Sequence, residues 1–147
     1  MNGIDDLERS VGTHLGYSEW HQVTQEQVNA FADATGDRQW IHVDPARAAV
    51  GPFGAAIAHG YLTLSLVPMF LSQIYRVDGP SMMVNYGTDK VRFPSIVPVG
   101  SRLRGGAELL AVTPISSGHQ FAIRVTVERQ SGGKPACVAD VLTVAVS

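Results

Sequence analysis

The segment from Tyr61 to Ile74 constrains the fold more than any other part of the sequence, because its apolar residues occupy nearly every side of a helix. A helix of that kind has to be buried on most sides. The segment is too short to cross a membrane, which takes about 20 apolar residues. We therefore expect a buried central helix that begins at His59–Gly60, continues to about Tyr75 and is kinked at Pro68.

The sequence after Gly79–Pro80 is typical of β-strands. Apolar and polar residues alternate most clearly from His119 to Arg129, with the period of two that a half-buried strand shows. The other expected strands are Ser81–Tyr86, Asp89–Phe93, Arg102–Val112 and Pro135–Ser147. Helices followed by about four antiparallel strands predict an α+β fold, in which a curved sheet wraps around the central helix.

Two shorter helices are expected before the central one. Thr24 begins a capping-box pattern with Gln27, and Gly36 ends the helical spacing as a C′ glycine does. These signals predict a helix over Thr24–Thr35. Asp44–Pro45 begins a second short helix, with the aspartate as its cap. Residues 36–45 are expected to form the loop between the two helices.

Length, charge and cysteine content limit the class of protein. The 147 residues suit one globular domain over residues 1–147, and the formal net charge of -2 offers no basic surface for nucleic acid or an anionic membrane. We expect neither as a partner. The single cysteine, Cys137, excludes an internal disulfide and fits a reducing cytoplasm. It lies in a strand without a basic neighbour, so we expect a structural thiol.

A carboxylate and an imidazole, Asp37 and His42, lie close together in the expected loop. Gly60 begins the central helix, where its N–H has no helical partner and lies at the positive end of the helix dipole. A base, an acid and an oxyanion donor are the groups needed for addition next to a carbonyl. Each residue also has a structural explanation: Asp37 could brace a turn, His42 could hold a loop, and Gly60 could allow close packing.

These residues resemble a motif of the MaoC-like dehydratase family, and specifically of the R-specific enoyl-CoA hydratases. The family motif, Gly-Asp-x-Asn-Pro-x-His, is followed by His-Gly at the start of the hotdog helix. Here it reads Gly36-Asp37-Arg38-Gln39-Trp40-Ile41-His42, and then Ala58-His59-Gly60. The stretch Val91–Gly100 is similar to the family's strand-end motif. The resemblance covers roughly Gln22–Val146, which is nearly the whole chain.

The sequence departs from the family motif where Gln39–Trp40 replaces Asn-Pro. This variant resembles a single-domain subgroup that includes NodN-like proteins. Gln39 keeps a carboxamide that could orient a water or Asp37, although its side chain is one methylene longer. Trp40 could narrow or wall the acyl pocket.

The resemblance implies a hotdog homodimer with each site near the subunit interface. It implies reversible syn addition of water to a trans-2-enoyl-CoA or enoyl-acyl-carrier-protein, giving an (R)-3-hydroxyacyl thioester. Asp37 and His42 would be the acid/base pair and Gly60 the oxyanion donor, with no metal or other cofactor required. The residues expected to contact substrate are Gln39, Trp40, Phe53, His59, Tyr61, Asn85 and Tyr86.

Two other functions fit the same residues. Some hotdog proteins hydrolyse acyl thioesters with a carboxylate and a helix-end amide, although the spacing of Asp37 and His42 favours a hydratase. A NodN-like chain could instead be a non-catalytic module that binds acyl thioesters or regulates another protein, and Gln39–Trp40 keeps that alternative open. The aromatic candidates fit a core position as well as a pocket wall, and Asn85 and Tyr86 could simply pair across the sheet.

Overall fold

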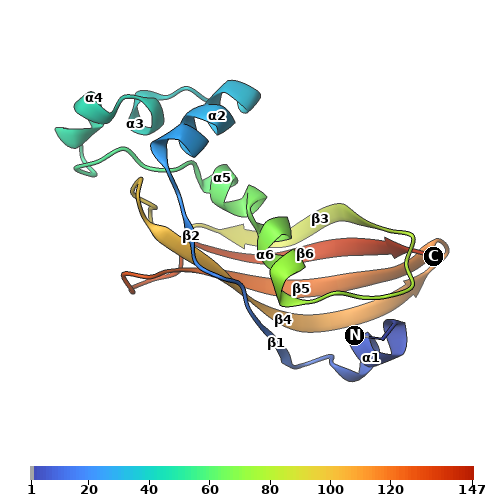
Figure 1. Cartoon of the computed structure of the whole chain (residues 1–147). Coiled ribbons are helices and arrows are strands. Elements are labelled where there is room, and N and C mark those ends of the chain that lie inside the picture. Colours follow the sequence, from blue (N-terminus) through green and yellow to red (C-terminus); the bar gives the residue numbers. More distant parts are fainter. Residues whose placement is uncertain (1) are drawn as a thin grey trace.

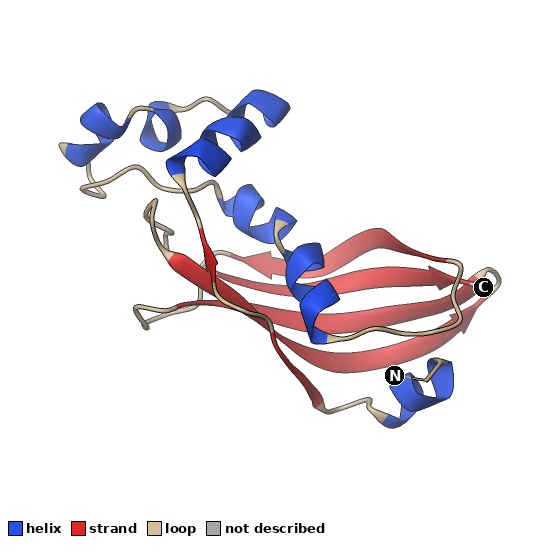
Figure 2. Ribbon diagram, viewed as in Figure 1, coloured by secondary structure: helices blue, strands red, loops and turns tan. Residues whose placement is uncertain are grey.

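An antiparallel sheet forms the main layer of the protein, in a computed structural model that describes residues 2–147 (Figure 1). Its strands lie in the order β1-β4-β5-β6-β3, and β2 also pairs with β4. The strands are β1 (His14–Tyr17), β2 (His21–Gln22), β3 (Met82–Arg92), β4 (Arg102–Ile115), β5 (Gly118–Arg129) and β6 (Cys137–Val146). The sheet curves around a helical segment that lies across its face (Figure 2), which confirms the predicted α+β architecture.

The alternation in β5 places its apolar side chains in the core, as predicted. Phe121, Ile123, Val125 and Val127 are all fully buried, whereas the residues between them are partly or wholly exposed. Strand β4 contributes Leu103 to the same buried cluster. The central helical segment covers this face of the sheet, so the core lies between the two layers.

The central helical segment is broken into two helices, α5 (Gly60–Ser65) and α6 (Val67–Ile74). The kink predicted at Pro68 is confirmed, but the prediction of one continuous helix is wrong. Pro68 lies in the first turn of α6, where a missing N–H leaves no hydrogen bond unmade. Fully buried Phe70 packs on Gly105 of β4, where a Cβ would lie only 2.8 Å from the Cβ of Phe70.

The helix predicted from its caps is confirmed as α2 (Gln25–Thr35). The Gln27 N–H donates to the Thr24 hydroxyl at 3.1 Å, and Gly36 has the left-handed φ of 85°. Asp44 likewise caps α4 (Pro45–Ala49). The prediction of a continuous loop between these helices is wrong, because one turn forms at α3 (Trp40–Val43). So short a helix has no periodicity to detect.

Several boundaries at the sheet differ from the prediction. The two strands predicted after Gly79–Pro80 are one bulged strand, β3, and β4 continues three residues beyond Val112 to Ile115. Strands β1 and β2 were not predicted, because two to four residues are too few to show alternation. Helix α1 (Ile4–Arg9) was also missed; only its Leu7 is fully buried. No helix among residues 2–147 is long and apolar enough to cross a membrane.

Candidate functional site

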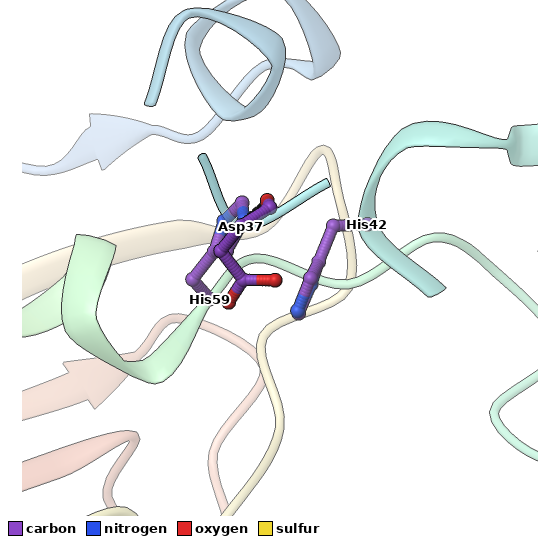
Figure 3. A group of neighbouring side chains, drawn as sticks. All are labelled: Asp37, His42 and His59. Carbon is purple, nitrogen blue, oxygen red and sulfur yellow. Dashed lines mark hydrogen bonds between the residues drawn. The ribbon is translucent and has the colours of Figure 1, made fainter. Parts of the chain in front are cut away.

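Three side chains from separate segments meet beside the start of α5: Asp37, His42 and His59 (Figure 3). Asp37 follows α2, His42 lies in α3 and His59 is the N-cap residue of α5. One ring nitrogen of each histidine and a carboxylate oxygen of Asp37 all lie within 4.8 Å of one another. Both histidines are buried and Asp37 is exposed. We call these three residues the acid/base cluster.

The turn at Gly36 ends α2, so Asp37 lies outside the helix and its carboxylate can accept hydrogen bonds. Asp37 Oδ1 accepts a long hydrogen bond of 3.4 Å from the Gln39 N–H. The neighbouring Arg38 forms its ion pair with Asp33 instead, at 3.3 Å. Within residues 2–147, no lysine or arginine forms a salt bridge with Asp37. The carboxylate therefore retains acceptor capacity for a ligand.

His42 is held at both its ring and its main chain. Its Nδ1 lies 2.7 Å from the main-chain carbonyl of Ile57, and its own carbonyl accepts from the Gln25 side chain at 2.7 Å. A carbonyl only accepts, so Nδ1 is the donor and a neutral ring has its lone pair on Nε2. This hydrogen bond fixes His42 in the tautomer that a proton acceptor needs.

His59 connects the other two members of the acid/base cluster. Its ring stacks on that of His42 with centroids 3.8 Å apart and planes at 22°. Its Nε2 lies 2.9 Å from the main-chain carbonyl of Asp37 and donates to it. Phe31 of α2 contacts the ring at a centroid distance of 4.9 Å. From the sequence, His59 could equally hold the loop before the helix or contact substrate; its stacking on His42 was not predicted.

The loop after β3 forms backbone hydrogen bonds with the extended segment that precedes His59. The Ala58 N–H donates to the Val97 carbonyl at 2.8 Å, and the Val99 N–H donates to the Ala56 carbonyl at 2.9 Å. Arg129 of β5 steadies the same loop through a hydrogen bond of 3.2 Å to the Ile96 carbonyl. The motif that resembles the family's strand-end motif therefore holds the backbone to which His42 is bonded.

Gly60 has a packing reason to be glycine. A Cβ at this position would lie 2.9 Å from Cδ2 of Phe93, closer than carbon atoms approach. The N–H of Gly60, at the first position of α5, has no acceptor within the helix. The packing explanation is therefore compatible with the oxyanion-donor prediction for the same residue.

Most of the other predicted contact residues are exposed. The Gln39 side chain is exposed, and only its N–H contacts Asp37. Trp40 packs under the guanidinium of Arg47, 4.3 Å from the ring centroid. The remaining aromatic candidates, all exposed in this chain, are Phe53, Tyr61 and Tyr86.

Asn85 lines two adjoining cavities between the central helices and the β3–β6 side of the sheet. Their volumes are about 480 and 330 Å³, and both are also lined by Pro68, Leu71 and Thr143. Neither cavity is lined by the acid/base cluster. The cavities and the cluster therefore occupy separate places in this chain.

The acid/base cluster could also hold a divalent transition metal, since two imidazoles and a carboxylate are suitable ligands. Each histidine donates its other ring N–H to a backbone carbonyl, as metal-binding histidines usually do. The sequence prediction assigned no metal here.

Outside the cluster, burial raises the pKa of the Cys137 thiol to about 11. That shift disfavours the thiolate and agrees with a structural thiol.

Comparison with known proteins gives one consistent answer. The family described as "MaoC like domain" matches residues 6–130. The chain is 52% identical over 141 residues to 3-hydroxyacyl-thioester dehydratase Z of Mycobacterium tuberculosis, covering 95% of this chain and 93% of that protein. It is 43% identical over 153 residues to nodulation protein N of Rhizobium leguminosarum, covering 96% and 89%.

Solved structures agree with the sequence comparisons. The (R)-hydratase of A. caviae involved in PHA biosynthesis superposes with a TM-score of 0.74 at 25% identity, over 90% of this chain and 94% of that one. The predicted hotdog fold is therefore confirmed. The chain belongs to the MaoC-like dehydratase family.

Proposed function

We propose that this protein is a hydro-lyase that adds water reversibly to a trans-2-enoyl thioester, giving an (R)-3-hydroxyacyl thioester. The observation that carries the proposal is the meeting of Asp37 and His42 in one cluster, with His42 fixed in an accepting tautomer. The relative at 52% identity is named as a 3-hydroxyacyl-thioester dehydratase, which supports the same reaction class. The substrate is an acyl thioester of coenzyme A or of an acyl carrier protein.

The reaction needs a base because water is a poor nucleophile, whose pKa in bulk lies far above neutral pH. A water between Asp37 and His42 donates a hydrogen to each. As its oxygen bonds to the β-carbon, one of these protons passes to the side chain that accepts it. The pair delivers one proton to the α-carbon on the same face, so it ends with as many protons as it began. This gives syn addition.

Negative charge develops on the thioester oxygen during this addition. The N–H of Gly60 has no helical acceptor and is the donor that we assign to that oxygen. A single donor of this kind is worth roughly 3–4 kcal/mol in other enzymes. Thioester hydrolysis would instead direct water at the carbonyl carbon and release a thiol, and no contact in the acid/base cluster favours that reaction over hydration.

We further propose that the protein acts as a homodimer paired through β3. This strand pairs only with β6 among the described residues, so its other edge is open. It exposes several large apolar side chains: Met82, Met83, Val84 and Tyr86. An open apolar edge favours pairing with another strand. A second copy there would also cover the cavity lined by Met83, and would make it a slot for the acyl chain.

The proposal is tested with crotonyl-CoA and longer trans-2-enoyl-CoA substrates. Hydration is followed by loss of the enoyl-thioester absorbance, and the configuration of the product is determined by chiral analysis. A thiol reagent in a parallel assay detects hydrolysis. Release of free thiol without loss of the double bond would make the protein a thioesterase, and binding without either reaction would make it a binding module.

A further inference from the structure

The His59 ring contains a buried hydrogen-bonding atom that the protein does not use. The residue is 2% exposed, and Nε2 donates to the Asp37 carbonyl. A neutral ring with its proton on Nε2 has its lone pair on Nδ1. Nδ1 is buried and has no partner in the described part of the chain, residues 2–147. Leaving a buried acceptor unpaired costs free energy, so an atom that is not part of the protein is expected to bind there.

The position of the ring places this unused atom at the acid/base cluster. The centroids of His42 and His59 are 3.8 Å apart and the rings are nearly parallel, so the His59 ring lies against His42. Figure 3 shows the Asp37 side chain directed toward His42. One ring nitrogen of each histidine and a carboxylate oxygen of Asp37 lie within 4.8 Å of one another, so a water held among them is close to the His59 ring. Water is the smallest ligand that could satisfy Nδ1.

We propose that His59 is a third catalytic residue, whose Nδ1 binds the reacting water together with Asp37 and His42. The proposal rests on the hydration reaction proposed above and extends it. Through its hydrogen bond to the Asp37 carbonyl and its stacking on His42, the same ring also holds the backbone of Asp37 and the ring of His42 in place.

Counting protons shows what the third group contributes. The three side chains offer three acceptors for the two hydrogens of one water, so each hydrogen keeps an acceptor as the water turns towards the β-carbon. During hydration, the water oxygen bonds to the β-carbon and the π electrons move toward the thioester carbonyl. One water proton passes to the cluster, and one proton passes from the cluster to the α-carbon. The cluster regains its starting state, and one water has been added.

Two substitutions at His59 distinguish this role from a structural one. His59→Phe keeps the stacked ring but removes both nitrogens. His59→Asn loses the ring but places an amide oxygen at the position of Nδ1. If His59 only packs against its neighbours, the Phe variant is the more active. If Nδ1 binds the reacting water, the Asn variant is the more active.

We expect His59→Phe to lower kcat by at least about 10-fold, with KM within about threefold of wild type. His59→Asn should recover part of that loss. His14→Phe is the matched control, since His14 on β1 also packs against an aromatic ring, that of Tyr17, with centroids 4.7 Å apart. It should retain wild-type activity. A Phe variant as active as the Asn variant, or within about twofold of wild type, would overturn the assignment.

A crystal structure of the unliganded wild-type protein tests the proposal independently of any activity. We expect an ordered water within about 3.2 Å of His59 Nδ1 that also contacts Asp37 or His42, and its loss in His59→Phe. A well-defined site without such a water would overturn the proposal even if a variant fails to fold. A wild-type protein that holds this water but hydrates no enoyl thioester would instead refute the proposed reaction.

Discussion

Substituting Gly60 with alanine tests whether this residue is needed for packing, because alanine keeps the backbone N–H and adds only a Cβ. That Cβ would lie 2.9, 3.0 and 3.1 Å from three ring atoms of Phe93. Carbon atoms in contact prefer about 3.5–4.0 Å, so the ring has to retreat by roughly half an ångström. Phe93 is 40% exposed and can move. We therefore expect a cost of about 1–2 kcal/mol, at the lower end of overpacking.

In a chain of this size, that cost should lower the melting temperature by roughly 2–8 °C. Phe93→Ala removes all three ring atoms, so Gly60→Ala should cost little in that background. Gly87→Ala on β3 is the matched control, because a Cβ there meets nothing within 4 Å. An equal loss of stability from Gly60→Ala with and without the Phe93 ring would refute the packing argument.

The Phe93→Ala protein also allows the role of the Gly60 N–H to be tested separately from packing. Proline is tolerated at a first helical position, and His59 already has the extended φ of -61° and ψ of 141° that suits a residue before proline. Gly60→Pro in the Phe93→Ala protein should therefore fold and lose hydration activity, whereas Gly60→Ala in that protein should keep it. Retained activity in the proline variant would show that the oxyanion is stabilised elsewhere.

Four further predictions concern individual residues. Asp37→Asn and His42→Ala should each lower turnover by at least about 10² without a large change in melting temperature, as acid/base residues do; near-native turnover would remove the assignment. Gln39→Ala should change activity by no more than about twofold, as expected for an exposed side chain. Zn²⁺ should inhibit in titrations by occupying the acid/base cluster, and EDTA should leave the metal-free activity unchanged. Burial of Cys137 raises its pKa from 9.0 to about 11, so the folded protein retains a proton that the unfolded chain loses. Its contribution to stability is complete below pH 9 and should be lost as the pH rises towards 11 in denaturant titrations, relative to Cys137→Ala.

Local signals in the sequence were sufficient for the elements whose ends or faces they specify. Thr24 and Gly36 mark the two ends of α2 because a cap satisfies backbone groups within a few residues of itself. The burial of Phe121 and its neighbours follows from strict alternation in β5. The break before α6 was foreseen only as a kink, since Pro68 does not reveal whether the chain bends or starts a new helix.

The site was predicted in part, for a similar reason. Asp37 and His42 are close in sequence and share a family motif, so their meeting could be expected. The stacking of His59 on His42 depends on where the chain returns after α4, which no local pattern records. The unpartnered nitrogen of His59 is still harder to predict from sequence, because it is recognised only by the absence of a contact in the folded structure. The cavities beside Asn85 likewise depend on how α6 crosses the sheet.

The hydrogen bonds that orient the cluster explain why a departure from the family motif can leave it intact. The imidazoles of His42 and His59 are held by main-chain carbonyls, those of Ile57 and Asp37. The contact from Gln39 to Asp37 is also made by a backbone N–H. Main-chain groups are present whatever the side chain, so replacing Asn-Pro by Gln39–Trp40 removes none of these bonds. What changes is the packing around α3 and α4, where Trp40 lies under Arg47. The substitution therefore leaves in place the main-chain hydrogen bonds that hold Asp37, His42 and His59.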